Sequence, residues 1–289
     1  MSEPVRVDFP QTVQQDASIA HEAALALERA VGDPEALAIT SAIYKNQHDQ
    51  DIYFEAVEQE IKRKRFDVHL AGIEVFNKEG IEALLITEAL KMQYNRLGAS
   101  QGAIFLVIDI DGLKKINDQE GLGHPVGDKV IYGVAEALRK ALRSTDDIGR
   151  YGGDEFIALL PLTEDNQELA LKIIEEGGLD HSGQLQEGIR EKFIGHLGIN
   201  YQSLLKAYGD RWPEKKDGVV PGMASLGWHY FSREEFLNRY QAFLKSDEKG
   251  KLFSQMLMKE ADEQLYEAKR ARSITPASSP DVPPETPSS

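Results

Sequence analysis

The chemistry that this sequence can perform is concentrated in one short segment, Arg150 to Phe156, which reads Arg-Tyr-Gly-Gly-Asp-Glu-Phe. Short apolar runs flank the segment, so the pattern predicts a strand, a tight turn and a second strand. Gly152 and Gly153 are expected to supply the positive φ that such a turn requires. Asp154 and Glu155 place two like charges together, which costs free energy unless a cation or a proton compensates. The hairpin therefore predicts a divalent metal site.

A second acidic stretch must come close to the hairpin for this site to form. The apolar run 103–108 predicts a buried central strand, and it leads directly into Asp109-Ile110-Asp111. Mg²⁺ is usually bound through one or two carboxylates together with the phosphates of a substrate. Two acidic strand ends would therefore form a nucleoside triphosphate site, with Asp109 and Asp154 as the first candidate ligands.

The order of the motifs resembles the GGDEF family, whose members are diguanylate cyclases or degenerate relatives of them. The segments 114–118 and 123–128 are similar to the family's Lys-x-x-Asn-Asp and Gly-His-x-x-Gly-Asp. Ser225-Leu226-Gly227 resembles a later core strand, and 261–269 resembles the family's closing helix, with Phe253, Leu257, Ala261 and Leu265 on one apolar face. The resemblance covers about residues 66 to 273.

The resemblance implies a role for each polar position of these motifs. A carboxylate suits guanine, because the base presents N1–H and an amine as adjacent donors. The implied roles are guanine reading by Asn117 and Asp128, phosphate contacts by Lys114 and Lys269, close substrate approach at Gly152 and Gly153, binding of Mg²⁺ or Mn²⁺ by Asp109, the Ile110 carbonyl, Asp154 and Glu155, and help with proton removal from Asp154 or Glu155.

Two of these assignments have plainer alternatives. Asp128 precedes apolar residues at helical spacing, Val130, Ile131, Val134 and Leu138, so it could equally be the N-cap of a helix. Lys114 and Lys115 alone would be a solvated basic pair at a helix start. The position of both within the family motifs favours the functional interpretation.

A further pair, Arg143 and Asp146, precedes the hairpin. Arg143 stands nine residues before Gly152, where the family has an Arg-x-x-Asp site that binds the product and stops turnover. An arginine can clasp a phosphate or a guanine edge with its planar fork. The alternative is a surface ion pair, which contributes little to stability.

The chain also departs from the family pattern. Gly121 and Leu122 are two additional residues in the guanine loop, and the expected phosphate-binding arginine is off register near Arg270 or Arg272. The region 177–222 is an insertion, in which Leu185, Ile189, Phe193 and Leu197 predict an amphipathic helix. Trp212 to Gly218 is interpreted as an exposed turn.

Residues 1–65 are expected to form a separate helical unit for regulation or dimerisation, with helices over 19–31, 36–44 and 52–66. Phe54, Val57 and Ile61 form an apolar stripe that either packs on the rest of the chain or pairs with a second copy, and packing is preferred. Residues 66–273 are the expected cyclase domain. The Pro- and Ser-rich residues 274–289 predict a disordered tail.

Composition narrows the class of protein further. The 289-residue chain has 41% hydrophobic residues, which is ordinary for a globular cytoplasmic protein, and no apolar run approaches a membrane span. The absence of cysteine excludes disulfides and thiolate chemistry. A net charge of −15 argues against nucleic acid as a partner.

We therefore expect an α/β, palm-like nucleotidyl cyclase fold of the α+β kind, with a mainly antiparallel sheet flanked by helices. The implied reaction joins two GTP into cyclic di-GMP across a homodimer and releases two pyrophosphates. Alternatives are an inactive GGDEF domain that acts as a cyclic di-GMP receptor, and a palm domain that uses another nucleotide. The last is disfavoured because Asp128 would repel the acceptor N1 of adenine.

Overall fold

The computed structural model describes residues 11–30, 44, 47–64, 66–67, 70, 72–95, 99–176, 178–179, 185–186, 188–215, 219–246 and 252–274. The tail 275–289 lies outside these residues, as does the helix expected over 36–44 apart from Tyr44.

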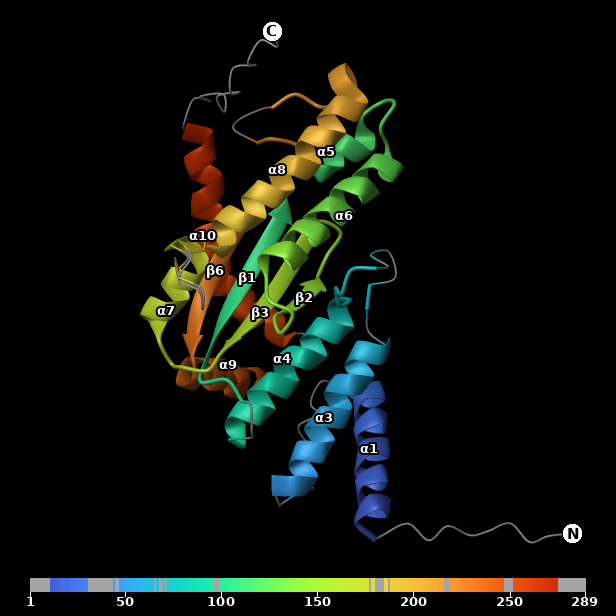
Figure 1. Ribbon diagram of the computed structural model, residues 1–289, viewed down its shortest axis with the longest axis vertical. Helices are drawn as coiled ribbons and strands as arrows, with labels where there is room; N and C mark the ends of the chain where they lie inside the picture. Colours follow the sequence, from blue (N-terminus) through green and yellow to red (C-terminus); the bar gives the residue numbers. More distant parts are fainter. Residues whose placement is uncertain are drawn as a thin grey trace, which may run out of the picture.

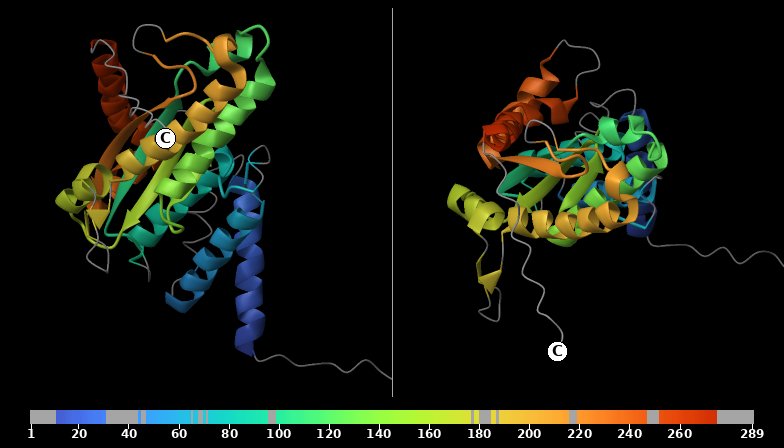
Figure 2. Two further views of the ribbon diagram at one scale, coloured as in Figure 1. Left: turned by 45° about the horizontal axis from the view of Figure 1, so that its top comes forward. Right: turned by 90° about the horizontal axis from the view of Figure 1, so that it is seen from above.

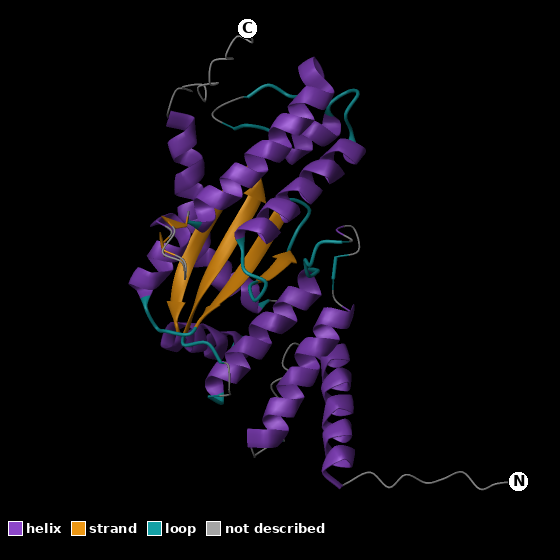
Figure 3. Ribbon diagram, in the orientation of Figure 1, coloured by secondary structure: helices purple, strands orange, loops and turns teal. Residues whose placement is uncertain are grey.

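The centre of the structure is a four-stranded sheet in which every neighbouring pair is antiparallel (Figure 3). Its order is β2-β3-β1-β6, from β2 (Asp147–Arg150), β3 (Glu155–Leu162), β1 (Gly102–Ile110) and β6 (Ala224–Ser232). A two-stranded sheet pairs β4 (Gly178–Leu179) with β5 (Leu185–Gln186). The predicted α/β fold with an antiparallel sheet is confirmed, and so are the predicted strands at 103–108, on both sides of the hairpin and at 225–227.

Helices cover both faces of this sheet, and Figure 2 shows α8 and α10 on opposite sides. One face carries α5 (Leu113–Asp118), α6 (His124–Ala141) and α8 (Ile189–Tyr208). The other carries α4 (Lys78–Gln93), α9 (Arg233–Leu244) and α10 (Phe253–Ile274). A short helix α7 (Gln167–Leu171) and a π-helical turn at Lys172–Glu176 follow β3. Because both faces are covered, β1 is a continuous apolar run and not an alternating one.

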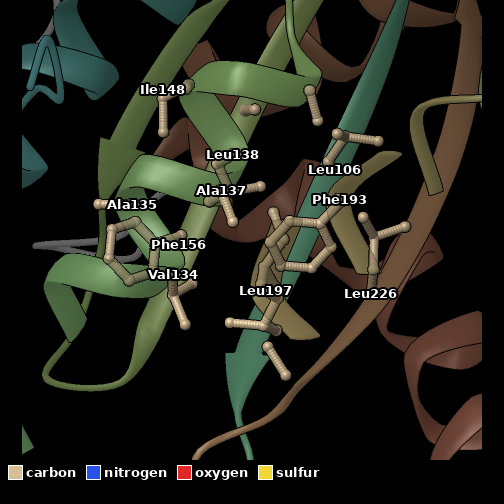
Figure 4. Close-up of a cluster of buried hydrophobic side chains, with 14 of the residues drawn as sticks. Leu106, Val134, Ala135, Ala137, Leu138, Ile148, Phe156, Phe193, Leu197 and Leu226 are labelled. Atoms are coloured by element: carbon tan, nitrogen blue, oxygen red, sulfur yellow. The ribbon is translucent and has the colours of Figure 1, made fainter. Parts of the chain in front are cut away.

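The helix within residues 177–222 completes the core on the α6 side. Phe193 and Leu197 of α8 pack toward Leu106 and Leu226 of the sheet (Figure 4). The expected helix thus exists, but its start at Leu185 was wrong, because Leu185 belongs to β5 and α8 begins at Ile189. The chain turns at Gly188, where a Cβ would lie only 2.6 Å from the Ile174 carbonyl oxygen.

The N-terminal region forms two helices that pack on each other, α1 (Gln11–Ala30) and α3 (Gln47–Lys64) (Figure 1). The side chains of Phe54, Val57 and Ile61 are at most 2% exposed, and they share one apolar cluster with α4 and β1. The preferred interpretation, that this stripe packs within the chain, is confirmed. A regulatory role of residues 1–65 stays a prediction.

The segment between α3 and α4 is attached to the strand that enters the hairpin. The Phe76 amide donates to the Ile148 carbonyl at 2.7 Å, and the Arg150 amide donates to the Phe76 carbonyl at 2.8 Å. An ion pair joins Arg150 to Asp67 at 3.5 Å. The free edge of β2 is therefore partly covered, which protects it from pairing with another chain.

Candidate active site

The register of the sheet brings the two predicted acidic stretches together. Asp109 on β1 lies directly opposite Glu155 on β3, and the next amide, that of Ile110, donates to the Asp154 carbonyl oxygen at 3.0 Å. Directly opposed residues of antiparallel strands point to the same face, with Cβ atoms about 5 Å apart. Val107 and Ile157, which share that face, contact the α4 and α10 side of the core. The carboxylates of Asp109 and Glu155 therefore lie on that side.

The turn itself differs from the prediction. Neither Gly152 nor Gly153 has a positive φ, so the expected reason for the two glycines was wrong. The turn is closed by the Tyr151 amide, which donates to the Glu155 carbonyl at 2.8 Å. At Gly152 a Cβ would stand 2.9 Å from the Glu155 carboxylate, while Gly153 faces open space. Gly152 therefore leaves room for the Glu155 carboxylate, whereas a side chain at Gly153 would meet no neighbouring atom.

Asn117 lies against Gly127, the residue before Asp128, where α5 meets α6. The Asn117 Oδ1 atom is buried without a hydrogen-bond partner among the described residues, and it lies 2.0 Å from where a Cβ on Gly127 would stand. Asp128 is exposed and follows Gly127 directly. Gly127 was not among the predicted site residues, although the second glycine of Gly-His-x-x-Gly-Asp was the available signal.

The alternative role of Asp128 as a helix N-cap was wrong. Helix α6 begins at His124, its N-cap is Gly123 with φ 71°, and Pro125 lies in its first turn. Asp128 is thus inside the helix, because the glycine and proline before it start the helix earlier than the apolar spacing indicated. Gly121 and Leu122, which were expected to be additional residues, lie in the loop before α6, where Gly121 has φ 80° and Leu122 is buried in the core.

Lys114 lines a cleft between α5 and the segment 210–215. The cleft has a volume of about 950 Å³, and Lys114, Lys115 and the segment 210–215 line it. Trp212 was expected in an exposed turn but is 7% exposed, and its Nε1 donates to the Pro221 carbonyl at 3.0 Å. This hydrogen bond holds Trp212 against Pro221 on the side of the cleft that faces α5.

Arg143 and Asp146 form a local turn. The Asp146 carboxylate is 3% exposed and accepts the Arg143 main-chain amide at 2.8 Å, while the Arg143 side chain is exposed. Burial raises the pKa of Asp146. The carboxylate therefore stabilises the turn that enters β2, and product binding at this pair stays a prediction.

The closing helix is confirmed as α10, and it packs closely on β6. At Gly227 a Cβ would lie 2.4 Å from the Ala261 carbonyl oxygen and 2.7 Å from the Leu265 amide nitrogen. Lys269 belongs to this helix, but its side chain lies outside the described part, as do those of Arg270 and Arg272.

In the part of the chain that the structure describes, the candidate site has too few protein ligands to bind a metal ion without a substrate. Within the described residues, no three His, Cys, Asp or Glu side chains stand close enough together to hold an ion alone. Asp109 and Glu155 supply two carboxylate groups with hard oxygen donors. Mg²⁺ is usually bound by one or two protein carboxylates when phosphates of a substrate complete its coordination. The donor set thus fits a metal–nucleotide complex better than a permanent metal centre.

An antiparallel sheet with acidic strand ends and helices on both faces defines a palm-like α/β domain. Residues 81–206 match the family model described as "Diguanylate cyclase, GGDEF domain". This part of the chain is a domain of the GGDEF family. The match ends before β6 and α10, so it is shorter than the expected 66–273.

Relatives align with only part of their own length. Diguanylate cyclase DgcP of Pseudomonas aeruginosa is 46% identical over 79 residues, which are 27% of this chain and 12% of that protein. Probable diguanylate cyclase DgcC of Escherichia coli is 34% identical over 106 residues, 37% of this chain and 27% of DgcC. Cyclic di-GMP phosphodiesterase NbdA of P. aeruginosa is 40% identical over 67 residues, 23% of this chain and 8% of NbdA.

The comparison with solved structures found a sensory box/GGDEF family protein from Caulobacter crescentus. Its sequence is 22% identical and the TM-score is 0.42. The match covers 70% of this chain and 96% of that one. Diguanylate cyclase SiaD of P. aeruginosa, solved with its activator SiaC, has 21% identity and a TM-score of 0.44, and the match covers 90% of this chain and 79% of that one.

No described helix of this chain is long and apolar enough to cross a membrane.

Proposed function

We propose that this protein is a diguanylate cyclase, which condenses two GTP molecules into cyclic di-GMP and releases two pyrophosphates. The observation that supports the proposal most strongly is the pairing of Asp109 with Glu155 at the end of the sheet, inside a GGDEF domain. Two relatives named as diguanylate cyclases agree with it.

Each group of candidate residues has a role in the proposed reaction that suits its chemistry. Asn117 and Asp128 read the guanine base, and Lys114 and Lys269 balance phosphate charge. Asp109, the Ile110 carbonyl, Asp154 and Glu155 hold Mg²⁺ or Mn²⁺, which when bound neutralises charge on the phosphates. Asp154 or Glu155 takes the proton of the attacking 3′-hydroxyl. Phosphoryl transfer asks the protein mainly for positioning and charge stabilisation, which this set provides.

The reaction requires two copies of the chain. Each 3′-hydroxyl attacks the α-phosphate of the other GTP, so each protomer contributes one half of the reaction site. We therefore infer a homodimer during turnover. Arg143 and Asp146 are the proposed site of product inhibition, with the exposed Arg143 guanidinium as the group that would contact the product.

The test is incubation of the purified protein with GTP and Mg²⁺, followed by mass spectrometry for cyclic di-GMP. Asp109→Asn and Glu155→Gln should each lower the rate about 100-fold or more, because each removes charge that holds the metal and substrate. Glu164→Gln, an exposed carboxylate beyond the other end of β3, is the control and should change the rate less than about twofold.

Other outcomes separate the alternatives. Binding of cyclic di-GMP without turnover would identify a receptor and contradict the enzyme proposal. A cyclic product from ATP under the same conditions would identify a cyclase for another nucleotide. Equal rates for Asp109→Asn and the Glu164→Gln control would place the reaction elsewhere in the chain.

A further inference from the structure

Glu82 is a buried carboxylate at the contact between α4 and α10. Its side chain is 5% exposed although it is a glutamate. Its Oε2 accepts the main-chain amide of Ser254 at 3.1 Å, and its Oε1 accepts the amide of Phe253. These two residues open α10, and the first amides of a helix have no partner within the helix. Helix α4 thus supplies the acceptors that α10 lacks.

This arrangement does more than satisfy two amides. A local Ser, Asp or Asn cap would accept them at the surface without burying a charge, which is costly. Glu82 instead joins two positions 171 residues apart in the chain. Burial raises the pKa of Glu82, and the Ser254 and Phe253 amides oppose that shift. An ionised carboxylate at this position also lies at the positive end of the α10 dipole, which strengthens the bond. The particular effect of Glu82 is to fix α10 relative to α4.

Helix α10 leads from this bond toward the acidic end of the sheet. It starts beside α9, which follows β6 at Ser232, and it then crosses β6 at Gly227 (Figure 1). Residues beyond Ala261 continue toward the end of β6 where Ser225 pairs with Asp109. Because α10 is a single helix, the position of its later residues relative to the site depends on where its first turn is held.

We propose that Glu82 is a positioning residue for α10, which sets this helix over the sheet end that carries Asp109 and Glu155. The inference rests on the proposed function, because substrate phosphate is the group that α10 would meet there. Nothing in the hairpin, in the guanine-reading residues or in the metal ligands requires a buried glutamate on α4. The hydrogen bonds of Glu82 therefore act on the position of α10 from outside the substrate-binding residues.

The test compares Glu82→Gln with Glu88→Gln in the full chain. Glu88 is a matched control on the same helix, because it is 8% exposed and its Oε1 accepts the Ser100 amide at 2.9 Å, away from α10. In Glu82→Gln the amides at the start of α10 should exchange with deuterium about tenfold faster, since a carboxylate acceptor is replaced by a weaker amide acceptor. The KM for GTP should rise about fivefold while kcat changes less than about threefold. Glu88→Gln should show neither effect.

Two results would overturn the proposal. One is unchanged exchange in the peptide that contains Phe253 and Ser254, and the other is an equal change in KM for both variants. If Glu82→Gln does not fold, Glu82→Asp keeps the charge on a shorter side chain and should give a smaller change of the same kind. If the wild type makes no cyclic di-GMP, the proposed function fails, while the exchange measurement still decides whether Glu82 holds α10.

Discussion

In this structure, the role of a residue depends more on its neighbours than on its residue type. Asp109 and Asp111 are two residues apart, yet they have different surroundings. Asp109 faces Glu155 across the sheet, whereas the Asp111 carboxylate is buried and accepts the Ser225 hydroxyl at 3.0 Å. Ser225 is paired with Asp109 across the sheet, so its hydroxyl lies on the same face as Asp109 and binds the Asp111 carboxylate there. One acidic motif therefore supplies both a candidate ligand and a structural carboxylate.

Gly127 provides a test at the residue scale. A methyl group there would displace Asn117, because the Cβ would lie 2.0 Å from its Oδ1. Gly127→Ala should raise the KM for GTP about tenfold, which corresponds to the loss of one hydrogen bond to the base. The fold should not suffer, because alanine favours a helix by about 1 kcal/mol over glycine.

The control for this prediction lies in the same helix. At Gly133 a Cβ would be 3.4 Å from Asn200, which is close to ordinary contact, so Gly133→Ala should leave KM nearly unchanged. Steady-state kinetics with GTP measure both variants. Equal KM values would mean that Asn117 does not contact the substrate.

At the scale of elements, a group of charges joins the N-terminal helices to the strand that enters the hairpin. Lys91 of α4 forms an ion pair with Glu58 of α3, and Glu88 lies 4.0 Å from the same ammonium. Asp147, the first residue of β2, is partly buried beside them. Burial is the main cause that raises the pKa of Asp147 to about 7, and Glu58 and Glu88 raise it further while Lys62 opposes them.

This pKa predicts how stability depends on pH. Between about pH 4 and 7 the native state binds a proton at Asp147 that the unfolded chain has released, so the contribution of this group falls as pH rises to about 7 and stays low above it. Asp147→Asn should therefore raise the melting temperature more at pH 8 than at pH 5. The shift should be about 2–4 °C for each kcal/mol.

Thermal unfolding at the two pH values measures this difference, with the exposed Glu164→Gln as the charge-matched control. The prediction fails if Asp147→Asn changes the melting temperature equally at pH 5 and pH 8. It also fails if the control shows the same dependence, because the effect would then follow net charge and not the buried site.

At the scale of the whole molecule, the N-terminal helices and the sheet share one apolar cluster. Ile61 of α3, Leu85 of α4 and Phe105 of β1 are each fully buried in it. A shared core makes separate unfolding of α3 costly, because α4 would lose its apolar cover. The helical region and the GGDEF domain should therefore unfold together.

Ile61→Ala tests this expectation. The substitution should lower the free energy of unfolding by about 2–5 kcal/mol and move a single transition that includes the sheet. Ile199→Ala, at a side chain that is 66% exposed on α8, should change it by less than about 0.5 kcal/mol. Calorimetry that resolves two transitions, with only one of them moved by Ile61→Ala, would show that the helical region is an independent unit.

Much of this protein was determined by local sequence. The Gly-Gly-Asp-Glu hairpin, the apolar strand before Asp109 and the closing helix were predictable, because periodicity and turn residues act over a few positions. The order of the motifs along the chain also indicated the GGDEF family.

Only the tertiary structure decided the rest. It placed Asp109 opposite Glu155, buried Trp212 against Pro221 and set Glu82 at the start of α10. It also showed that neither hairpin glycine has a positive φ and that Gly152 leaves room for the Glu155 carboxylate. The physical reason is distance along the chain. Register, burial and contacts between remote residues arise from packing of the whole chain, and no short stretch of sequence contains that information.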